Sequence, residues 1–215
     1  MGQAGEQGWL AYLALIVSLF AIMNPLYSIS SFLVLSKNLP EQERRAVPIR
    51  TAFASFLIMV VAFFAGESIL RLFSLSLPAL RISGGLIVFA TGWSMVRGEL
   101  GAAKRNEGAG EVVDPSRSIA VIPLAMPLTA GPGAISMMVV VATYGNPWEG
   151  RVAVVFAVFF VCLSVWLALR MADSISRVLG ATGMDVVGRV MGLILLALSV
   201  EFIIAGLLEK FPGLG

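Results

Sequence analysis

Helix-breaking residues interrupt long apolar segments at two places in this chain, and hydroxyl side chains lie beside both interruptions. The first stretch, 24–31, reads Asn-Pro-Leu-Tyr-Ser-Ile-Ser-Ser, and the second, 123–136, reads Pro-Leu-Ala-Met-Pro-Leu-Thr-Ala-Gly-Pro-Gly-Ala-Ile-Ser. A proline inside a helix removes an amide donor and clashes with the carbonyl four residues back, which leaves that carbonyl unpaired. In lipid such a group must be paired within the protein or face a water-filled cavity.

Two broken helices that meet near the middle of a membrane offer binding groups of two kinds. The amides at half-helix N-termini suit a carboxylate, and the freed carbonyls together with hydroxyl groups suit a cation. Small residues around the second break leave room for a compact ligand, although close helix packing would use them equally well. The predicted substrate-binding residues are Asn24, Pro25, Tyr27, Ser28, Pro127, Thr129, Ala130, Gly131, Gly133, Ala134 and Ser136. The alternative for Asn24-Pro25 alone is a proline kink without a binding role.

Charged residues supply the remaining candidates. Glu201 lies in the last apolar segment, where it either carries a coupled proton or sits at the outer interface. With Ser28 and Thr129 it forms the predicted ion-coupling set. Arg81 and Arg189 begin two apolar segments at corresponding places, which indicates interfacial, structural or gating residues. Glu67/Arg71 and Asp173/Arg177 have the i,i+4 spacing of ion pairs within one helix.

The elements that must position these residues are membrane helices. Apolar residues make up 58% of the 215-residue chain and charged residues only 13%. A helix needs about 20 apolar residues to cross the hydrocarbon core. Six segments meet that requirement, at about 9–35, 46–70, 79–97, 118–143, 150–171 and 185–208. The first continues too long for a cleavable signal peptide and is expected to be a span.

The second half of the chain repeats features of the first half in the same order. Met-Asn-Pro-Leu at 23–26 corresponds to Met-Pro-Leu at 126–128, and Arg-x-x-Gly at 81–84 corresponds to 189–192. Two units of three spans must insert with opposite orientation, which is typical of secondary transporters. We therefore predict an all-α membrane protein of six transmembrane helices, built as two inverted three-helix repeats with a broken first helix in each. Residues 1–97 and 118–215 are the two repeats, and residues 98–117 are a cytoplasmic linker.

Basic residues predict the orientation. The loops after spans 1, 3 and 5 hold eleven of the fifteen Lys and Arg residues, and such loops stay on the cytoplasmic side. Both termini should then be periplasmic, in a multi-pass protein of a bacterial inner membrane. The expected partners are the lipid bilayer, a small-molecule substrate and H⁺ or Na⁺. No nucleic acid is expected, and homo-oligomerisation is left open.

Other classes of function fit the sequence less well. The chain has no histidine and one cysteine, Cys162, inside an apolar segment. The sequence also has no paired intramembrane carboxylates. The scarcity of such side chains argues against an enzyme, a metal centre or a cofactor. A passive channel or exporter of small metabolites without ion coupling is the alternative to a transporter.

Several of these motifs also resemble one family. Asn24-Pro25, the loop at 39–45, Leu-Arg-Ile-Ser-Gly-Gly at 80–85 and above all the block at 123–135 are similar to the MarC family of six-span inner-membrane proteins. The resemblance covers nearly the whole chain. It implies transport of small neutral amino acids such as glycine or alanine, driven by a cation gradient. Tyr27, Ser30 and Glu201 depart from the Gly, Pro and Gln expected there.

Overall fold

The computed structural model describes residues 2–98, 129–143, 148–211 and 213, and these residues form helices joined by short turns. Within these ranges there is no strand. In chain order the helices are α1 (Gly2–Met23), α2 (Pro25–Leu35), α3 (Glu41–Leu72), α4 (Leu77–Arg97), α7 (Pro132–Thr143), α8 (Trp148–Arg170) and α9 (Ala172–Lys210).

Length and hydropathy mark five of these segments as candidate membrane spans. They are Tyr12–Leu33, Glu41–Leu72, Leu77–Arg97, Gly150–Arg170 and Thr182–Lys210, and α7 is a shorter apolar helix. The predicted α-helical membrane protein is therefore confirmed. The six-span count stays a prediction, because the first part of the segment 118–143 and nearly all of the predicted linker lie outside the described residues.

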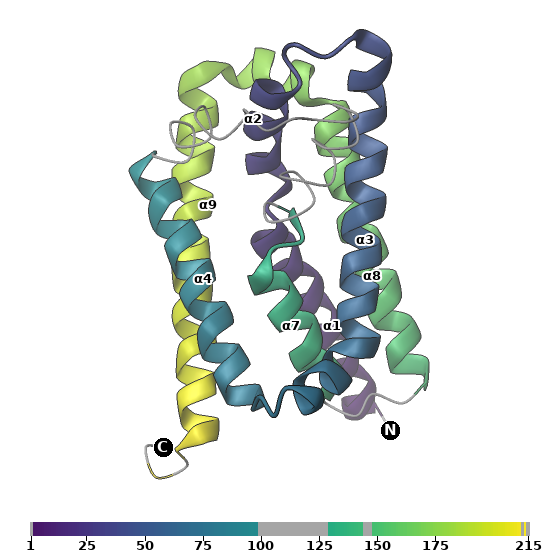
Figure 1. Ribbon diagram of the computed structural model, residues 1–215, viewed down its shortest axis with the longest axis vertical. Helices are drawn as coiled ribbons and strands as arrows, with labels where there is room; N and C mark the ends of the chain where they lie inside the picture. Colours follow the sequence, from purple (N-terminus) through teal and green to yellow (C-terminus); the bar gives the residue numbers. More distant parts are fainter. Residues whose placement is uncertain (1, 99–128, 144–147, 212, 214–215) are drawn as a thin grey trace.

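The helices run along one common direction (Figure 1). We call the end where α1 begins and α9 finishes the terminal end, and the opposite end the basic end. α1 and α2 lead from the terminal end to the basic end, α3 returns, and α4 leads back again. α7 and α9 run toward the terminal end, and α8 runs the other way. The described helices of the second half thus have the opposite sense to those of the first half.

Local sequence explains where several helices begin and end. Ser76 caps α4 by accepting a hydrogen bond from the Ala79 amide at 3.4 Å, and a proline stands in the first turn. Gly98 ends α4 in the left-handed conformation, with φ of 73°. α3 has acids in its first turn and Arg71 in its last, which suits the helix dipole. Arg71 also pairs with Glu67 at 2.6 Å, as its spacing predicts.

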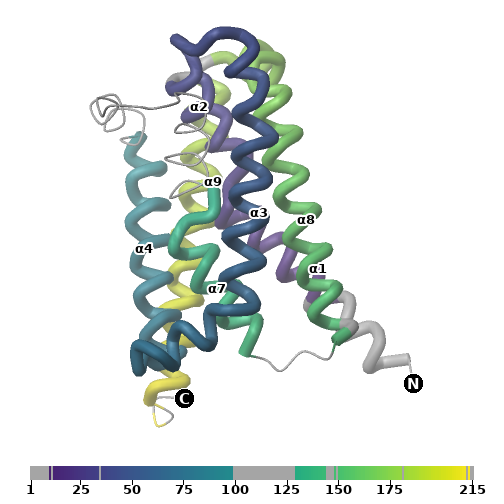
Figure 2. The backbone as a smooth tube through the Cα atoms, turned by 45° about the vertical axis from the view of Figure 1, so that its right-hand side comes forward, coloured from purple at the N-terminus to yellow at the C-terminus, as the bar shows by residue number. Residues whose placement is uncertain are grey.

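α4 and α9 lie side by side along most of α4 (Figure 2). Helix association in lipid lacks a hydrophobic drive, so close contact between small residues replaces it. A Cβ at Gly92 would approach the Gly192 carbonyl to 2.9 Å, and a Cβ at Gly192 would approach the Gly92 carbonyl to 2.9 Å. These two glycines let the two backbones touch and hold α4 against α9.

Apolar side chains fill the interior and also cover the outside. Leu19, Met23, Ile29 and Met138 are fully buried where α1, α2, α7 and α8 pack together. Large side chains on the outer faces are exposed, for example Phe53 on α3 at 66%. An outer surface of this kind fits contact with lipid.

Candidate functional site

The first helix break lies at Asn24, one residue before the proline. Asn24 takes the left-handed conformation, with φ of 43° and ψ of 67°, and separates α1 from α2. Its side-chain oxygen accepts a hydrogen bond from the Tyr27 amide at 3.2 Å and caps α2. Pro25 is the first residue of α2, where a missing amide costs nothing. The chain is thus broken at this point rather than kinked.

The second break lies immediately before α7. Thr129 and Ala130 are fully buried, and α7 then begins at Pro132. The Ser136 hydroxyl donates to the Pro132 carbonyl at 2.8 Å in the first turn of α7. A Cβ added at Gly133 would collide with the Val88 side chain and would approach that of Ile22 to 3.7 Å. Gly133 therefore lets α7 start close against Val88 of α4.

The two breaks meet in the interior. The Ser28 and Thr129 hydroxyl oxygens are 3.4 Å apart although 101 residues separate them in sequence. Ser28 also donates to the Asn24 carbonyl at 3.2 Å. α2 leads away from this point toward the basic end and α7 toward the terminal end (Figure 1), so two helix N-termini face the same buried layer. We call Asn24, Ser28 and Thr129 the break cluster.

Most of the predicted substrate-binding residues gather around this layer. Tyr27 and Gly131 are partly exposed, and Pro127 lies outside the described residues. The buried members are Asn24, Pro25, Ser28, Thr129, Ala130, Gly133, Ala134 and Ser136.

Two residues that the sequence analysis did not single out as site residues complete this layer. The Asn24 side-chain amide donates to the Met95 sulfur at 3.5 Å, which ties the break to α4. A Cβ at Gly84 would come within 2.5 Å of the Ser136 hydroxyl oxygen, so α4 and α7 fit together only with glycine there. The sequence marks Gly84, because it belongs to the repeated Arg-x-x-Gly pattern, but no sequence pattern marks Met95.

The charged candidates lie away from the break cluster. Glu201 is exposed on α9, whereas its neighbours Ser199 and Phe202 pack on Gly85 of α4. The Arg81 side chain is 12% exposed and pairs with Glu209 at 3.0 Å. This ion pair links the start of α4 to the finish of α9 at the terminal end. Arg189 pairs with Asp185 at 3.1 Å on the surface of α9. The two arginines that correspond in sequence thus make different contacts.

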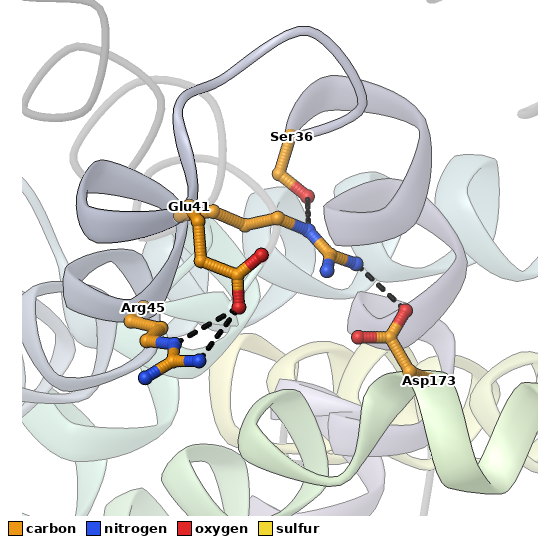
Figure 3. A network of polar contacts seen from close by, with 5 residues as sticks. Ser36, Glu41, Arg45 and Asp173 are labelled. Atoms are coloured by element: carbon orange, nitrogen blue, oxygen red, sulfur yellow. Dashed lines mark hydrogen bonds and ion pairs between the residues drawn. The ribbon is translucent and has the colours of Figure 1, made fainter.

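A polar network joins the end of α2 to the starts of α3 and α9 at the basic end (Figure 3). The Arg44 guanidinium donates to Asp173 at 2.7 Å and to the Ser36 hydroxyl at 3.2 Å. Its central carbon lies 5.4 Å from the centre of the Phe32 ring. The predicted pairing of Asp173 with Arg177 is wrong, because Asp173 instead joins the start of α9 to the start of α3. Arg45 pairs with Glu41 at 2.7 Å beside it.

The charge of Asp173 depends on this network. The hydrogen bond from Arg44 holds the pKa of the Asp173 carboxyl below its usual value, and the positive charges of Arg44 and Arg177 act in the same direction. Partial burial opposes this shift. Asp173 is therefore ionised, and the contact between α3 and α9 is present, at neutral pH.

The break cluster can bind charge without being charged itself. Hydroxyl oxygens and the Asn24 carbonyl are ligands for a small hard cation such as Na⁺. The positive ends of α2 and α7 favour a carboxylate. Among the described residues no three or more His, Cys, Asp or Glu side chains are grouped so that they could hold a metal ion. The arrangement suits non-covalent binding of a small ion or a zwitterion.

A bundle of candidate membrane spans with two helix breaks in its interior defines a polytopic α-helical membrane protein. The sequence model of the MarC family, described as "MarC family integral membrane protein", matches residues 9–211. The chain belongs to the MarC family.

Relatives with known names agree with this. A membrane protein of Buchnera aphidicola subsp. Schizaphis graminum is 36% identical over 203 residues, and YhcE of Escherichia coli K12 is also 36% identical over 203 residues; each match covers 94% of both chains. The inner membrane protein MarC of Escherichia coli O1:K1 is 37% identical over 205 residues, 90% of this chain and 92% of that protein. No solved structure matches. The chain is an integral inner-membrane protein, and its predicted membership of this family is confirmed.

Proposed function

We propose that this protein is a secondary active transporter of small neutral amino acids of the glycine and alanine class. The observation that carries the proposal is the meeting of two helix breaks, with the Ser28 and Thr129 hydroxyls 3.4 Å apart in the interior. A zwitterion fits there because its carboxylate can face the N-termini of α2 and α7. The buried small residues around the break cluster favour a ligand with little or no side chain.

The proposed architecture has six spans in two inverted repeats, with the segment 118–143 as the fourth span. The opposite sense of the described helices in the two halves supports this arrangement. The basic end would face the cytoplasm, since Arg44, Arg45 and Arg170 gather there, and both termini would be periplasmic.

The proposed coupling ion is Na⁺, with H⁺ as the alternative. The break cluster supplies oxygen ligands and holds no carboxylate, which supports a cation bound by neutral groups. Glu201, the candidate proton carrier, is exposed on α9. A role for Glu201 in coupling would therefore require a route along the outside of the helix bundle.

The test is uptake of labelled glycine and alanine by proteoliposomes under a Na⁺ gradient or a H⁺ gradient. Thr129→Val removes a hydroxyl at nearly constant volume, and we expect about a tenfold loss of apparent ion affinity. Thr91→Val is the matched control, because Thr91 is exposed on α4 and bonds only within its own helix. Glu201→Gln should retain coupling to Na⁺.

Other results would overturn parts of the proposal. Flux that follows the amino acid gradient and ignores both ions would make the protein a passive channel or exporter. Absence of uptake of either amino acid by folded protein would reject the substrate class. Equal behaviour of Thr129→Val and Thr91→Val would reject the break cluster as the ion site.

A further inference from the structure

A groove between α3 and α8 opens on the outer surface of the protein, away from the break cluster. Toward the basic end it contains a hollow of about 470 Å³ lined by aliphatic and aromatic side chains and Cys162. Ala52 and Cys162 form its buried floor, at 6% and 4% exposure. Phe53 and Phe159 line it and are exposed, at 66% and 48%. The hollow is therefore open to the hydrocarbon of a bilayer.

A charged pocket of about 300 Å³ lies directly next to this hollow. Pro48 lines the charged pocket and its neighbour Ile49 lines the apolar hollow. On the other side of the groove, the Arg170 guanidinium lies 5.3 Å from the centre of the Trp166 ring. Arg170 belongs to the pocket and Trp166 to the hollow, so the two form one continuous amphipathic groove.

Among the three arginines of the charged pocket, Arg170 is the one whose charge is not paired with a carboxylate of the described residues. Arg44 pairs with Asp173 and Arg45 pairs with Glu41, both at 2.7 Å. Arg170, in contrast, has no carboxylate partner within the part of the chain that the structure describes. Trp166 fixes the direction of its guanidinium, and stacking on tryptophan is typical of arginine at an interface. The groove thus presents one uncompensated positive charge above an apolar surface.

We propose that this groove is a binding site for a phospholipid with an anionic headgroup. The headgroup phosphate is bound by Arg170, and one acyl chain passes Trp166 and lies over Ala52 and Cys162. Ile49 and Phe56 are seven positions apart on α3, a rise of about 10 Å, which is about two thirds of the roughly 15 Å depth of one hydrocarbon leaflet. A free phosphate would leave the apolar hollow unused, whereas a phospholipid fills both parts.

The experiment measures quenching of tryptophan fluorescence by lipids with brominated acyl chains. Replacing Trp9, Trp93 and Trp148 with Phe leaves Trp166 as the reporter in the groove. Brominated phosphatidylglycerol should bind there with about fivefold higher affinity than brominated phosphatidylcholine, the factor expected for one arginine near an anionic surface. Arg170→Gln should abolish this preference, and Arg170→Lys should keep most of it.

Two controls come from the chain itself. A variant that keeps only Trp93 reports on α4, where this ring is 49% exposed and stacks on Phe89. Quenching of Trp93 by either lipid should be unchanged by Arg170→Gln. Arg97→Gln removes an equal charge from the C-terminal end of α4 and should leave quenching at Trp166 unchanged. Equal quenching of Trp166 by both lipids, or a preference that survives Arg170→Gln, would overturn the proposal.

Discussion

Asn24 determines the position of the first helix break through its backbone and its side chain together. Asn24→Ala removes the cap and places a Cβ without local hydrogen bonding in the left-handed region, which should cost about 2 kcal/mol. Asn24→Gly keeps the left-handed backbone but loses the cap and the weak contact with Met95, so it should cost only about a few tenths of a kcal/mol. The midpoint of thermal unfolding in detergent measures both. Asn38→Ala, in the exposed turn before α3, should be neutral. Equal losses for alanine and glycine would contradict the left-handed backbone.

At the scale of residues, the sequence predicted what depends on local chemistry. Asn24, Ser28 and Thr129 could be found because helix breakers in an apolar segment leave polar groups that must be satisfied. The partner of Asp173 could not be found. Arg177 has the spacing of a helical pair, but Arg44, 129 residues away, is held toward Asp173 by Ser36 and Phe32. Contacts of this kind depend on tertiary packing and leave no periodic signal.

α4 and α9 form a pair whose closeness rests on glycine. Gly92→Leu would drive a side chain into the Gly192 carbonyl and should lower stability by about 2 kcal/mol, the usual cost of overpacking. Ala90→Leu is the matched control, since Ala90 is exposed on the same helix. Thermal unfolding in detergent distinguishes the two variants. If both lowered the midpoint equally, the loss would reflect general sensitivity of α4 rather than contact with α9.

Hydropathy located the helices well but not their ends. The segments 46–70 and 79–97 lie within α3 (Glu41–Leu72) and α4 (Leu77–Arg97), because apolar length decides whether a helix spans a membrane. α9 begins at Ala172, well before the predicted start at 185. The first turns of α9 are more polar than the rest, so a search for apolar segments does not include them. Such a search also does not detect the change of helix direction at Gly180, where φ is 64°.

At the scale of the whole molecule, the Arg44–Asp173 pair joins the first half of the chain to the second. Because the pKa of Asp173 is lowered in the folded protein, the pair stabilises the fold above the ordinary pKa of aspartate, about 4. That contribution is lost as the pH falls through the lowered value. Both side chains are partly exposed, at 29% and 54%, so it should amount to at most about 1 kcal/mol.

The measurement compares the unfolding midpoints of the natural protein and Asp173→Asn between pH 8 and pH 3. The difference should be constant down to about pH 5 and should disappear in stronger acid. Asp185→Asn is the control, because Asp185 pairs with Arg189 within one helix. A difference that grew as the pH fell would contradict the assigned direction.

The Arg44–Asp173 pair also allows a test of the proposed transport cycle, in which this structure would be the state closed at the basic end. In this structure Ser28 is 1% exposed, and the contacts of Arg44 hold α2, α3 and α9 together at the basic end. If alternating access opens that end, Asp173→Asn should shift the population toward the open state by up to about fivefold. With Cys162→Ser as background, a Ser28→Cys thiol should then react faster with a membrane-impermeant maleimide added at the basic end. Asn38→Cys, in the exposed turn between α2 and α3 at the basic end, should react at an unchanged rate. An unchanged rate at Ser28→Cys would mean that Arg44–Asp173 stabilises the fold without controlling access to the break cluster.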